Sequence, residues 1–207
     1  MVNFFNMDCM DFMANVPNGF YDLAIVDPPY GIDAANMNLG NGVGTKSRKW
    51  TRKDWDSCVP EYVYFNELFR VSKNQIIWGA NYFMEYLPKT KCVLIWDKIQ
   101  EFSGADFELA FTSLDKPSKA FRMSRAEAYT KSNKIHPTEK PIKLYRWILS
   151  NFAEQGWKIL DTHGGSMSIA IACDMEGYDC DITEIDTEYF QIATARFFDY
   201  KRQLKLF

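Results

Sequence analysis

The residues best suited to chemistry are the tetrapeptide Asp27-Pro28-Pro29-Tyr30, which follows a short apolar run. A proline has no N–H and a φ angle held near about −65°, so two in succession make the backbone rigid. The Pro28 carbonyl is thereby kept beside the Asp27 carboxylate, with the Tyr30 ring next to both. Two acceptors and a ring in fixed geometry suit a flat molecule with an exocyclic amine. We therefore interpret the tetrapeptide as catalytic, against the alternative of a strand simply stopped by prolines.

A second candidate site is the turn from Asp161 to Ser168, which reads Asp-Thr-His-Gly-Gly-Ser-Met-Ser. It follows a short apolar run, and an acidic residue, Glu184, comes about twenty residues later. A strand, a glycine turn, a helix and an acid ending the next strand form the layout that binds an adenosine ribose. Glycines are common in such turns, so the pattern alone is equally consistent with an ordinary strand–helix connection.

Strands and helices alternate around these two sites. Buried-strand patterns occur at residues 22–26, 75–78, 92–96, 108–112, 157–160 and 178–185, and helical periodicity at residues 61–71, 141–155, 169–175 and 187–200. This alternation predicts an α/β fold with a mostly parallel sheet and helices on both faces. Ligands bind beyond the carboxyl ends of the strands in such sheets, where both candidate sites lie. With no repeat or linker, we expect one domain over residues 1–207.

The composition excludes several classes of protein. With 47% apolar and 25% charged residues, the chain does not resemble disordered, collagen-like or coiled-coil sequences. The start of the chain does not resemble a signal peptide, and no apolar run approaches the ~20 residues that span a bilayer. Five cysteines without a Cys-x-x-Cys pair and only two histidines make a disulfide framework or a metal site improbable. We expect a soluble cytoplasmic protein with no metal and no membrane association.

The net charge of −3 conceals two basic segments. One lies in the glycine- and asparagine-rich stretch 31–54, which is unusually long for a loop in a compact domain. The other lies between residues 112 and 143. Two interpretations remain open: solvated loops, or a surface that faces nucleic-acid phosphates, with Trp50 and Trp55 as stacking rings. The candidate DNA-contacting residues are Lys46, Arg48, Lys49, Arg52, Lys53, Lys116, Lys119, Arg122 and Arg125.

With these motifs the sequence resembles the amino-group DNA methyltransferases, which use S-adenosylmethionine. Residues 27–30 are similar to their catalytic tetrapeptide, and residues 161–168 to their cofactor-binding turn. The segment His-Pro-Thr-Glu-Lys-Pro at residues 136–141 resembles the one that precedes that turn, and residues 7–13 resemble a further family segment. The catalytic motif comes before the cofactor turn, as in the circularly permuted β class. Further similar stretches lie at residues 78–81, 95–98 and 107–111, so the resemblance extends over nearly the whole chain.

The resemblance implies a Rossmann-like, S-adenosylmethionine-dependent methyltransferase fold and roles for individual residues. Glu184 would bind the ribose hydroxyls of the cofactor and Asp8 its adenine amine. Asp161 would lie near the methionine ammonium, while Thr138 and Lys140 would hold the methionine carboxylate. The implied catalytic residues are Asp27, Pro28, Pro29 and Tyr30. The implied cofactor-binding residues are Asp8, Asp27, His136, Thr138, Lys140, Asp161, His163, Gly164, Gly165, Ser166, Ser168 and Glu184.

The implied activity is methylation of an exocyclic amine in double-stranded DNA. Aspartate at position 27 favours the N6 of adenine, with the N4 of cytosine as the alternative; RNA and protein-amide methyltransferases usually have asparagine there. Asp27 and the Pro28 carbonyl would turn the amine lone pair toward the methyl group, and in-line displacement would follow, with positioning supplying most of the rate. A base inside a duplex cannot reach such a pocket, so it would be flipped out and stacked on Tyr30.

The resemblance also assigns the less regular segments. Residues 31–54 would close over the substrate, and residues 112–133 would be a short target-recognition region, which suggests a brief target site or a homodimer. A bacterial or phage source is expected. One position departs from the family: Met167 stands where the turn usually has a second glycine, which would permit a positive φ angle or a close approach to the ligand. This departure motivates a second hypothesis, a catalytically impaired protein that still binds DNA.

Overall fold

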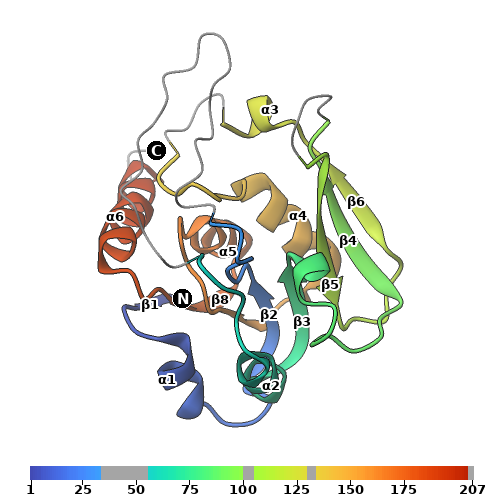
Figure 1. The fold of residues 1–207 in the computed structure, drawn as a ribbon. Coiled ribbons are helices and arrows are strands. Elements are labelled where there is room, and N and C mark those ends of the chain that lie inside the picture. The colour runs from blue at the N-terminus through green and yellow to red at the C-terminus, as the bar shows by residue number, and fades with distance from the viewer. Residues whose placement is uncertain (34–55, 100–104, 130–133, 205–207) are drawn as a thin grey trace.

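The computed structural model describes residues 1–33, 56–99, 105–129 and 134–204. This part of the chain forms one eight-stranded sheet in the order β1-β8-β7-β2-β3-β5-β4-β6 (Figure 1). Neighbouring strands are parallel except that β5 runs antiparallel to both β3 and β4. The strands are β1 (Val2–Phe5), β2 (Tyr21–Val26), β3 (Ser72–Trp78), β4 (Cys92–Asp97), β5 (Phe107–Thr112), β6 (Lys119–Arg122), β7 (Lys158–Asp161) and β8 (Asp179–Thr183). The predicted mostly parallel α/β fold is confirmed.

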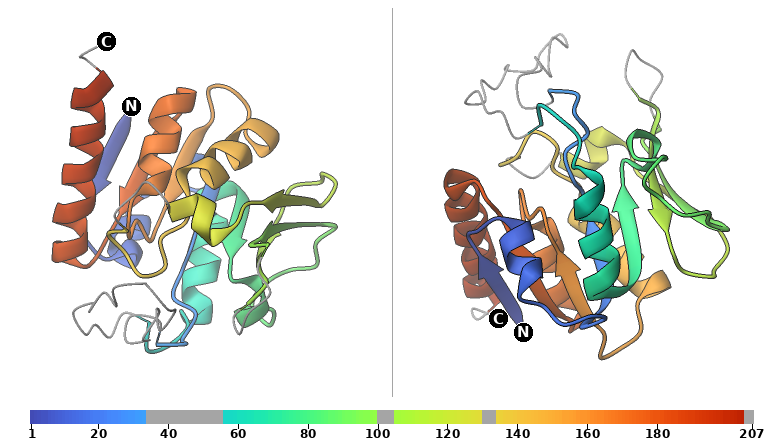
Figure 2. Two further views of the ribbon diagram at one scale, coloured as in Figure 1. Left: turned by 90° about the horizontal axis from the view of Figure 1, so that it is seen from above. Right: turned by 60° about the horizontal axis from the view of Figure 1, so that its bottom comes forward.

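Helices cover both faces of the sheet (Figure 2). One face packs against α4 (Ile142–Phe152), α5 (Ser168–Glu176) and α6 (Thr187–Leu204). The other packs against α1 (Cys9–Ala14), α2 (Tyr62–Val71) and the short 3₁₀ helix η2 (Ala80–Tyr82). The short helix α3 (Arg125–Tyr129) follows β6. No helix in these described ranges is long and apolar enough to cross a membrane.

Strand β2 shows why an unbroken apolar run folds this way. Its residues alternate between the two cores: Leu23 and Ile25 lie in the core beneath α4 and α5, whereas Ala24 and Val26 lie in the core beneath α1 and α2. Successive side chains of a strand point to opposite faces, so a strand that is covered on both sides must be apolar throughout. Asp27 is therefore placed at the end of the most protected part of the sheet.

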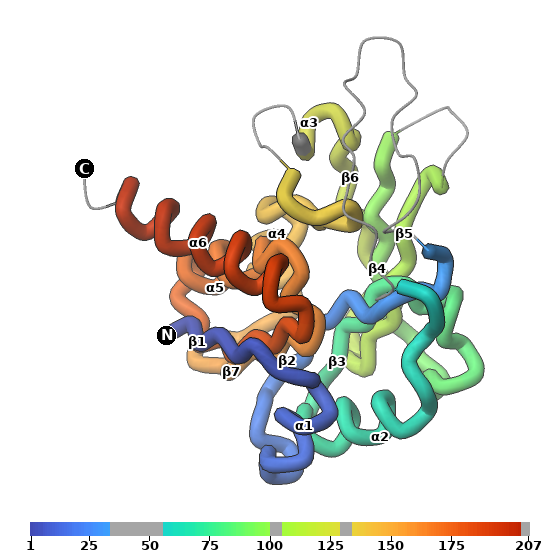
Figure 3. Tube along the Cα trace, turned by 60° about the vertical axis from the view of Figure 1, so that its left-hand side comes forward, coloured from blue at the N-terminus to red at the C-terminus, as the bar shows by residue number. Residues whose placement is uncertain are grey.

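The first strand and the last helix lie side by side, which the sequence did not indicate: β1 runs alongside α6 (Figure 3). The ring of Phe4 on β1 contacts the rings of Phe197 and Phe198 on α6, at centroid distances of 5.1 and 6.2 Å. Edge strand β1 pairs in parallel with β8. The chain then turns at Asp8, whose carboxylate caps α1 by accepting the Met10 N–H at 2.6 Å. Strand β1 thus carries the Asp8 turn to the same edge of the sheet as Asp27.

Candidate active site

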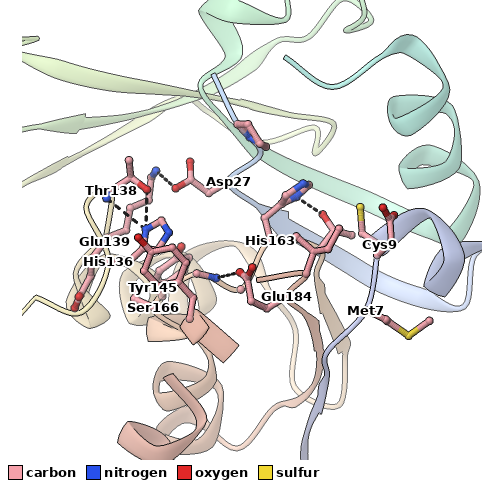
Figure 4. Close-up of a pocket in the computed structure, with 18 residues that line it drawn as sticks. Met7, Cys9, Asp27, His136, Thr138, Glu139, Tyr145, His163, Ser166 and Glu184 are labelled. Carbon is pink, nitrogen blue, oxygen red and sulfur yellow. Dashed lines mark hydrogen bonds and ion pairs between the residues drawn. The ribbon is translucent and has the colours of Figure 1, made fainter. Parts of the chain in front are cut away.

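A cavity of about 280 Å³ opens at the carboxyl ends of the parallel strands (Figure 4). Its walls come from five stretches of the chain: the turn before α1, the end of β2, residues 136–145, the turn after β7 and the residues after β8. This is the edge at which α/β sheets bind their ligands. The lining residues are Met7, Asp8, Cys9, Asp27, Pro29, His136, Thr138, Glu139, Lys140, Tyr145, Thr162, His163, Gly164, Gly165, Ser166, Glu184, Ile185 and Tyr189.

The cavity brings together most of the residues that the sequence singled out. From the cofactor set, the lining contains Asp8, Asp27, His136, Thr138, Lys140, His163, Gly164, Gly165, Ser166 and Glu184. Asp161 and Ser168 are buried but do not line the cavity, and neither do Pro28 and Tyr30 of the catalytic set. The aromatic and apolar lining residues Tyr145, Ile185 and Tyr189 were missed, because in the sequence they resemble ordinary core positions.

Glu184 joins the end of β8 to the turn after β7. One of its carboxylate oxygens accepts the Gly165 N–H at 2.7 Å, and the other accepts the Asp186 N–H at 2.8 Å. A carboxylate oxygen has two lone pairs, so each can accept a further hydrogen bond from a hydroxyl. Burial raises the pKa of Glu184, and the two backbone N–H groups oppose that rise. Backbone N–H groups thus hold the Glu184 carboxylate in place in the cavity lining.

The turn itself requires its glycines and strains its methionine. A Cβ on Gly164 would lie 2.8 Å from Ile182 Cγ2, so only glycine fits against β8. Gly165 has a φ of 49° and Met167 a φ of 51°. A positive φ at position 167 is what a glycine there would allow, and a methionine adopts it at a cost of about 1–2 kcal/mol. The Met167 side chain is 1% exposed in the core, which offsets that strain.

Two histidines in the lining are neutral at pH 7. Burial lowers the pKa of His136 to about 3, with Lys134 and Lys140 acting in the same direction, and burial lowers the pKa of His163 to about 4. The Nδ1 of His136 lies 3.1 Å from Thr138 Oγ1, and its ring meets the Tyr189 ring edge-on. Neutral imidazoles line the cavity and form hydrogen bonds, but they carry no positive charge that would attract an anionic ligand.

Asp27 is held by two charged or polar neighbours. Its Oδ1 accepts the Tyr30 hydroxyl at 2.5 Å, and its Oδ2 lies 2.5 Å from Lys140 Nζ. Lys140 Nζ also donates to the Tyr30 oxygen at 3.1 Å and lies 3.1 Å from Glu108 Oε2. Burial raises the pKa of Asp27, and the Lys140 ammonium opposes that rise. The structure thus places the Lys140 ammonium next to the Asp27 carboxylate; the implied contact of Lys140 with a methionine carboxylate stays a prediction.

The Tyr30 ring and the backbone next to it are both held in place by neighbouring residues. It stacks on Tyr82 with ring centroids 4.9 Å apart and planes inclined by 14°. A Cβ on Gly79 would lie 2.2 Å from the Tyr30 ring, so Gly79 must be glycine for the ring to occupy this position. The Tyr30 and Gly31 N–H groups donate to Asp56 Oδ1 at 2.6 and 3.0 Å. Tyr82, Gly79 and Asp56 are positioning residues that sequence analysis did not identify.

The candidate DNA-contacting residues are only partly described. Lys46, Arg48, Lys49, Arg52 and Lys53, with Trp50 and Trp55, lie outside the described residues. In the second segment, Lys116 and Lys119 donate to the carbonyl and side chain of Asn151, and Arg122 pairs with Asp97. These contacts attach residues 116–122 to the body of the protein, and β6 within this stretch pairs with β4. Part of the expected recognition region is therefore the edge of the central sheet.

The described His, Cys, Asp and Glu side chains form no group of three that could hold a metal ion. At this edge of the sheet, a carboxylate lies at the end of each of three neighbouring parallel strands: Asp27 after β2 and Glu184 after β8, which line the cavity, and Asp161 at the end of β7, which is buried beside it. Burial raises the pKa of Asp161 to about 7, and the charges of Asp27 and Glu184 add to the rise. Three neighbouring carboxyl groups favour a ligand that has hydroxyl groups to donate hydrogen bonds and a positive charge.

Comparison with known proteins identifies the family and the fold. The model of a DNA methylase family for N6 and N4 methyltransferases matches residues 77–195. The type II methyltransferase M2.MboI of Moraxella bovis is 19% identical over 245 residues, which cover 98% of this chain and 90% of that protein. The crystal structure of the M1.HpyAVI–SAM complex aligns with a TM-score of 0.60 at 18% identity, covering 95% of this chain and 100% of that one. The cytosine-N4-specific PvuII DNA methyltransferase aligns with a TM-score of 0.65 at 13% identity, covering 95% and 86%.

The fold is therefore that of the DNA methyltransferases, with the cavity at the carboxyl edge of its sheet. Because the family match extends over more than half of the chain, the chain belongs to the DNA methylase family of N6 and N4 methyltransferases. The matched segment begins after residues 27–30, so the assignment of the tetrapeptide depends on its own geometry beside Lys140.

Proposed function

We propose that this protein transfers a methyl group from S-adenosylmethionine to the exocyclic N6 of adenine in double-stranded DNA, as a member of the permuted β class. The observation that carries the proposal is the position of Asp27. Its carboxylate follows strand β2 and lies beside Tyr30, and Asp27 lines the same cavity as Glu184. An amine acceptor and an adenosine-type site thus share one cavity.

The residues present fit S-adenosylmethionine. Glu184 has free acceptor capacity for ribose hydroxyls, and Asp8 lies in the lining on the β1 side of the cavity. The aromatic and apolar walls formed by Tyr145, Ile185 and Tyr189 suit a purine ring. The cofactor carries an ammonium, which the buried carboxylate of Asp161 would favour by charge. When bound, S-adenosylmethionine supplies an electrophilic methyl group on a sulfonium centre.

Asp27 acts on the amine that is to be methylated. Its carboxylate and the Pro28 carbonyl would accept the two N–H hydrogens of the amine and turn the nitrogen lone pair away from the ring. An aromatic amine is a weak nucleophile because that lone pair is delocalised, so this orientation is where positioning accelerates the reaction. The methylated nitrogen must lose one proton, and Asp27 is placed to accept it. Lys140, 2.5 Å away, favours the ionised form of Asp27 that this role requires.

The geometry around Asp27 supports base flipping. Asp27 is largely buried and lines the cavity, with Tyr30 beside it, and a base stacked within a duplex could not reach this carboxylate. The Tyr30 hydroxyl donates a hydrogen bond to Asp27 Oδ1. The incoming amine therefore replaces the Tyr30 hydroxyl as the hydrogen-bond donor to that oxygen.

The direct test is transfer of a radiolabelled methyl group from S-adenosylmethionine to unmethylated genomic DNA, followed by digestion to nucleosides. We expect the label in N6-methyladenine. Asp27→Ala is expected to abolish transfer and leave the affinity for S-adenosylmethionine, measured by calorimetry, nearly unchanged. Retained transfer by this variant would refute the role assigned to Asp27.

The same assay decides between the proposal and its two alternatives. The structural likeness to the cytosine-N4-specific PvuII enzyme is the observation that keeps cytosine N4 in view. Label in N4-methylcytosine would establish that substrate instead. No label, together with DNA binding and no heat on titration with S-adenosylmethionine, would establish the DNA-binding homologue that Met167 suggests. A homodimer stays a prediction for sedimentation analysis.

A further inference from the structure

Four side chains of alternating charge run from the cavity to the far side of β5. Asp27 Oδ2 lies 2.5 Å from Lys140 Nζ, Lys140 lies 3.1 Å from Glu108 Oε2, and Glu108 Oε1 lies 2.8 Å from Lys98 Nζ. The sequence places these residues after β2, before α4, on β5 and after β4. The resemblance included the stretches that contain Lys98 and Glu108 but assigned them no role.

The sheet topology brings Glu108 to the site. Strand β5 is antiparallel to β3 and β4, so its beginning lies at the edge where those two strands end. Trp78 at the end of β3 pairs with Ala110, and Trp96 near the end of β4 pairs with Glu108. A carboxylate at the start of a parallel strand would have been at the opposite edge. The reversed strand is therefore what supplies a second carboxylate behind Lys140.

The Lys140 ammonium lies among three oxygens. It is close to Asp27 Oδ2 and donates to the Tyr30 hydroxyl, and its contact with the buried Glu108 Oε2 is an ion pair in which that oxygen accepts no hydrogen bond. The Lys140 side chain is 2% exposed, and the nitrogen lies over the rings of Tyr30 and Trp78 at 5.6 and 5.4 Å. A buried ammonium with a single carboxylate partner would carry a large desolvation cost, and a second carboxylate reduces it. Glu108 therefore determines where Lys140 can point.

We propose that Glu108 is a positioning residue for methyl transfer: through Lys140 it fixes the orientation of the Asp27 carboxylate and balances the charge next to it, and Lys98 holds Glu108 in place. This inference rests on the role proposed above for Asp27. Glu108 does not line the cavity, so it acts without touching the substrate.

Removing the negative charge of Glu108 and removing the positive charge of Lys140 are expected to shift the pKa of Asp27 in opposite directions. The charged and titratable groups that face Asp27 are Tyr30, Lys140, Glu108 and, from the end of β7, Asp161. Burial raises the pKa of Asp27, Glu108 raises it further, and Lys140 lowers it. Glu108→Gln removes an influence that raises this pKa, so the pKa falls. Lys140→Gln removes the influence that lowers it, so the pKa rises.

The test measures the titration of Asp27 in the full chain by carboxyl ¹³C NMR, with the signal assigned by its loss in Asp27→Asn. We expect the midpoint to move to lower pH in Glu108→Gln and to higher pH in Lys140→Gln. Asp181→Asn is the matched control: it removes another buried carboxylate, paired with Lys158 at 2.8 Å, and should leave Asp27 unaffected. The inference would be overturned if the Asp27 titration midpoint were unchanged in both Glu108→Gln and Lys140→Gln, or if it moved in the same direction in both.

Kinetics supply the second measurement. Glu108→Gln should lower kcat between about tenfold and a hundredfold, as expected for a misplaced reacting group, with the KM for S-adenosylmethionine unchanged. Glu108→Asp keeps the charge and should recover part of this loss, whether or not Glu108→Gln folds well. A loss of stability with an unchanged kcat would show a structural role only and refute the inference. Inactive wild-type protein would refute the proposed function instead, and the NMR titration would still decide the role of Glu108.

Discussion

The Tyr30 ring stacks on the Tyr82 ring with the two planes inclined by only 14°, while the Tyr30 hydroxyl donates to Asp27. Tyr82 is 41% exposed, at the end of η2, so the stack reaches from the Asp27 carboxylate to the protein surface. One face of Tyr30 is thus covered by Tyr82. If a flipped base stacks on Tyr30, as we propose, it must use the other face or take the place of Tyr82.

Replacing Tyr82 by alanine is expected to weaken methyl transfer without affecting cofactor binding. An aromatic stack contributes about 0.5–1.5 kcal/mol, so kcat/KM for DNA should fall roughly two- to tenfold. Tyr82→Phe keeps the ring and should retain wild-type activity. The measurement is steady-state methylation of a duplex of varied concentration. An increase in kcat/KM for Tyr82→Ala would show that Tyr82 competes with the base for Tyr30, contrary to this prediction.

The buried carboxylate of Asp161 makes stability depend on pH. Burial raises its pKa to about 7, so the folded state favours the protonated form. Its contribution to the free energy of unfolding is then greatest below the unfolded-state pKa near about 4 and is lost as pH rises through about 7. Relative to Asp161→Asn, wild-type protein should lose roughly 2–4 kcal/mol between pH 5 and pH 8, measured by urea unfolding. Parallel curves for the two proteins would contradict the assignment.

A cationic ligand next to Asp161 would reduce this dependence. S-adenosylhomocysteine carries the same ammonium as the proposed cofactor and favours the ionised carboxylate. With saturating S-adenosylhomocysteine, the difference between wild type and Asp161→Asn should therefore depend less on pH. An unchanged difference would place the ammonium away from Asp161.

Met167 has two opposing effects on stability: its backbone is strained and its side chain is buried. Glycine at this position would relieve left-handed strain of about 1–2 kcal/mol, but deletion of a buried methionine side chain costs about 2–5 kcal/mol. Met167→Gly is therefore expected to destabilise the protein by about 1–3 kcal/mol in urea unfolding. Met167→Leu keeps the volume and the strain and should change stability by less than about 1.5 kcal/mol. A stabilised glycine variant would show that the strain dominates.

The parts of the fold that the sequence predicted well have strong local signals. Strand β2 contains an unbroken apolar run at residues 23–26, followed by Asp27 and two prolines, and α4 has five buried residues at helical spacing. Strands β1 and β6 were missed because they are four-residue edge strands without a fully buried face. Edge strands form through their neighbours, and a short segment carries little periodicity of its own.

The candidate site also has a part that the sequence predicted and a part that it did not. Asp27, the glycine turn and Glu184 follow buried strands, and parallel strands bring their carboxyl ends to one edge, so the sequence determined which of these residues share a cavity. Only the tertiary structure decided what surrounds Asp27. Lys140 and Tyr30 are 110 residues apart in the chain, and Glu108 reaches them because β5 is reversed. Strand order and direction follow from packing of the whole sheet, which no local pattern specifies.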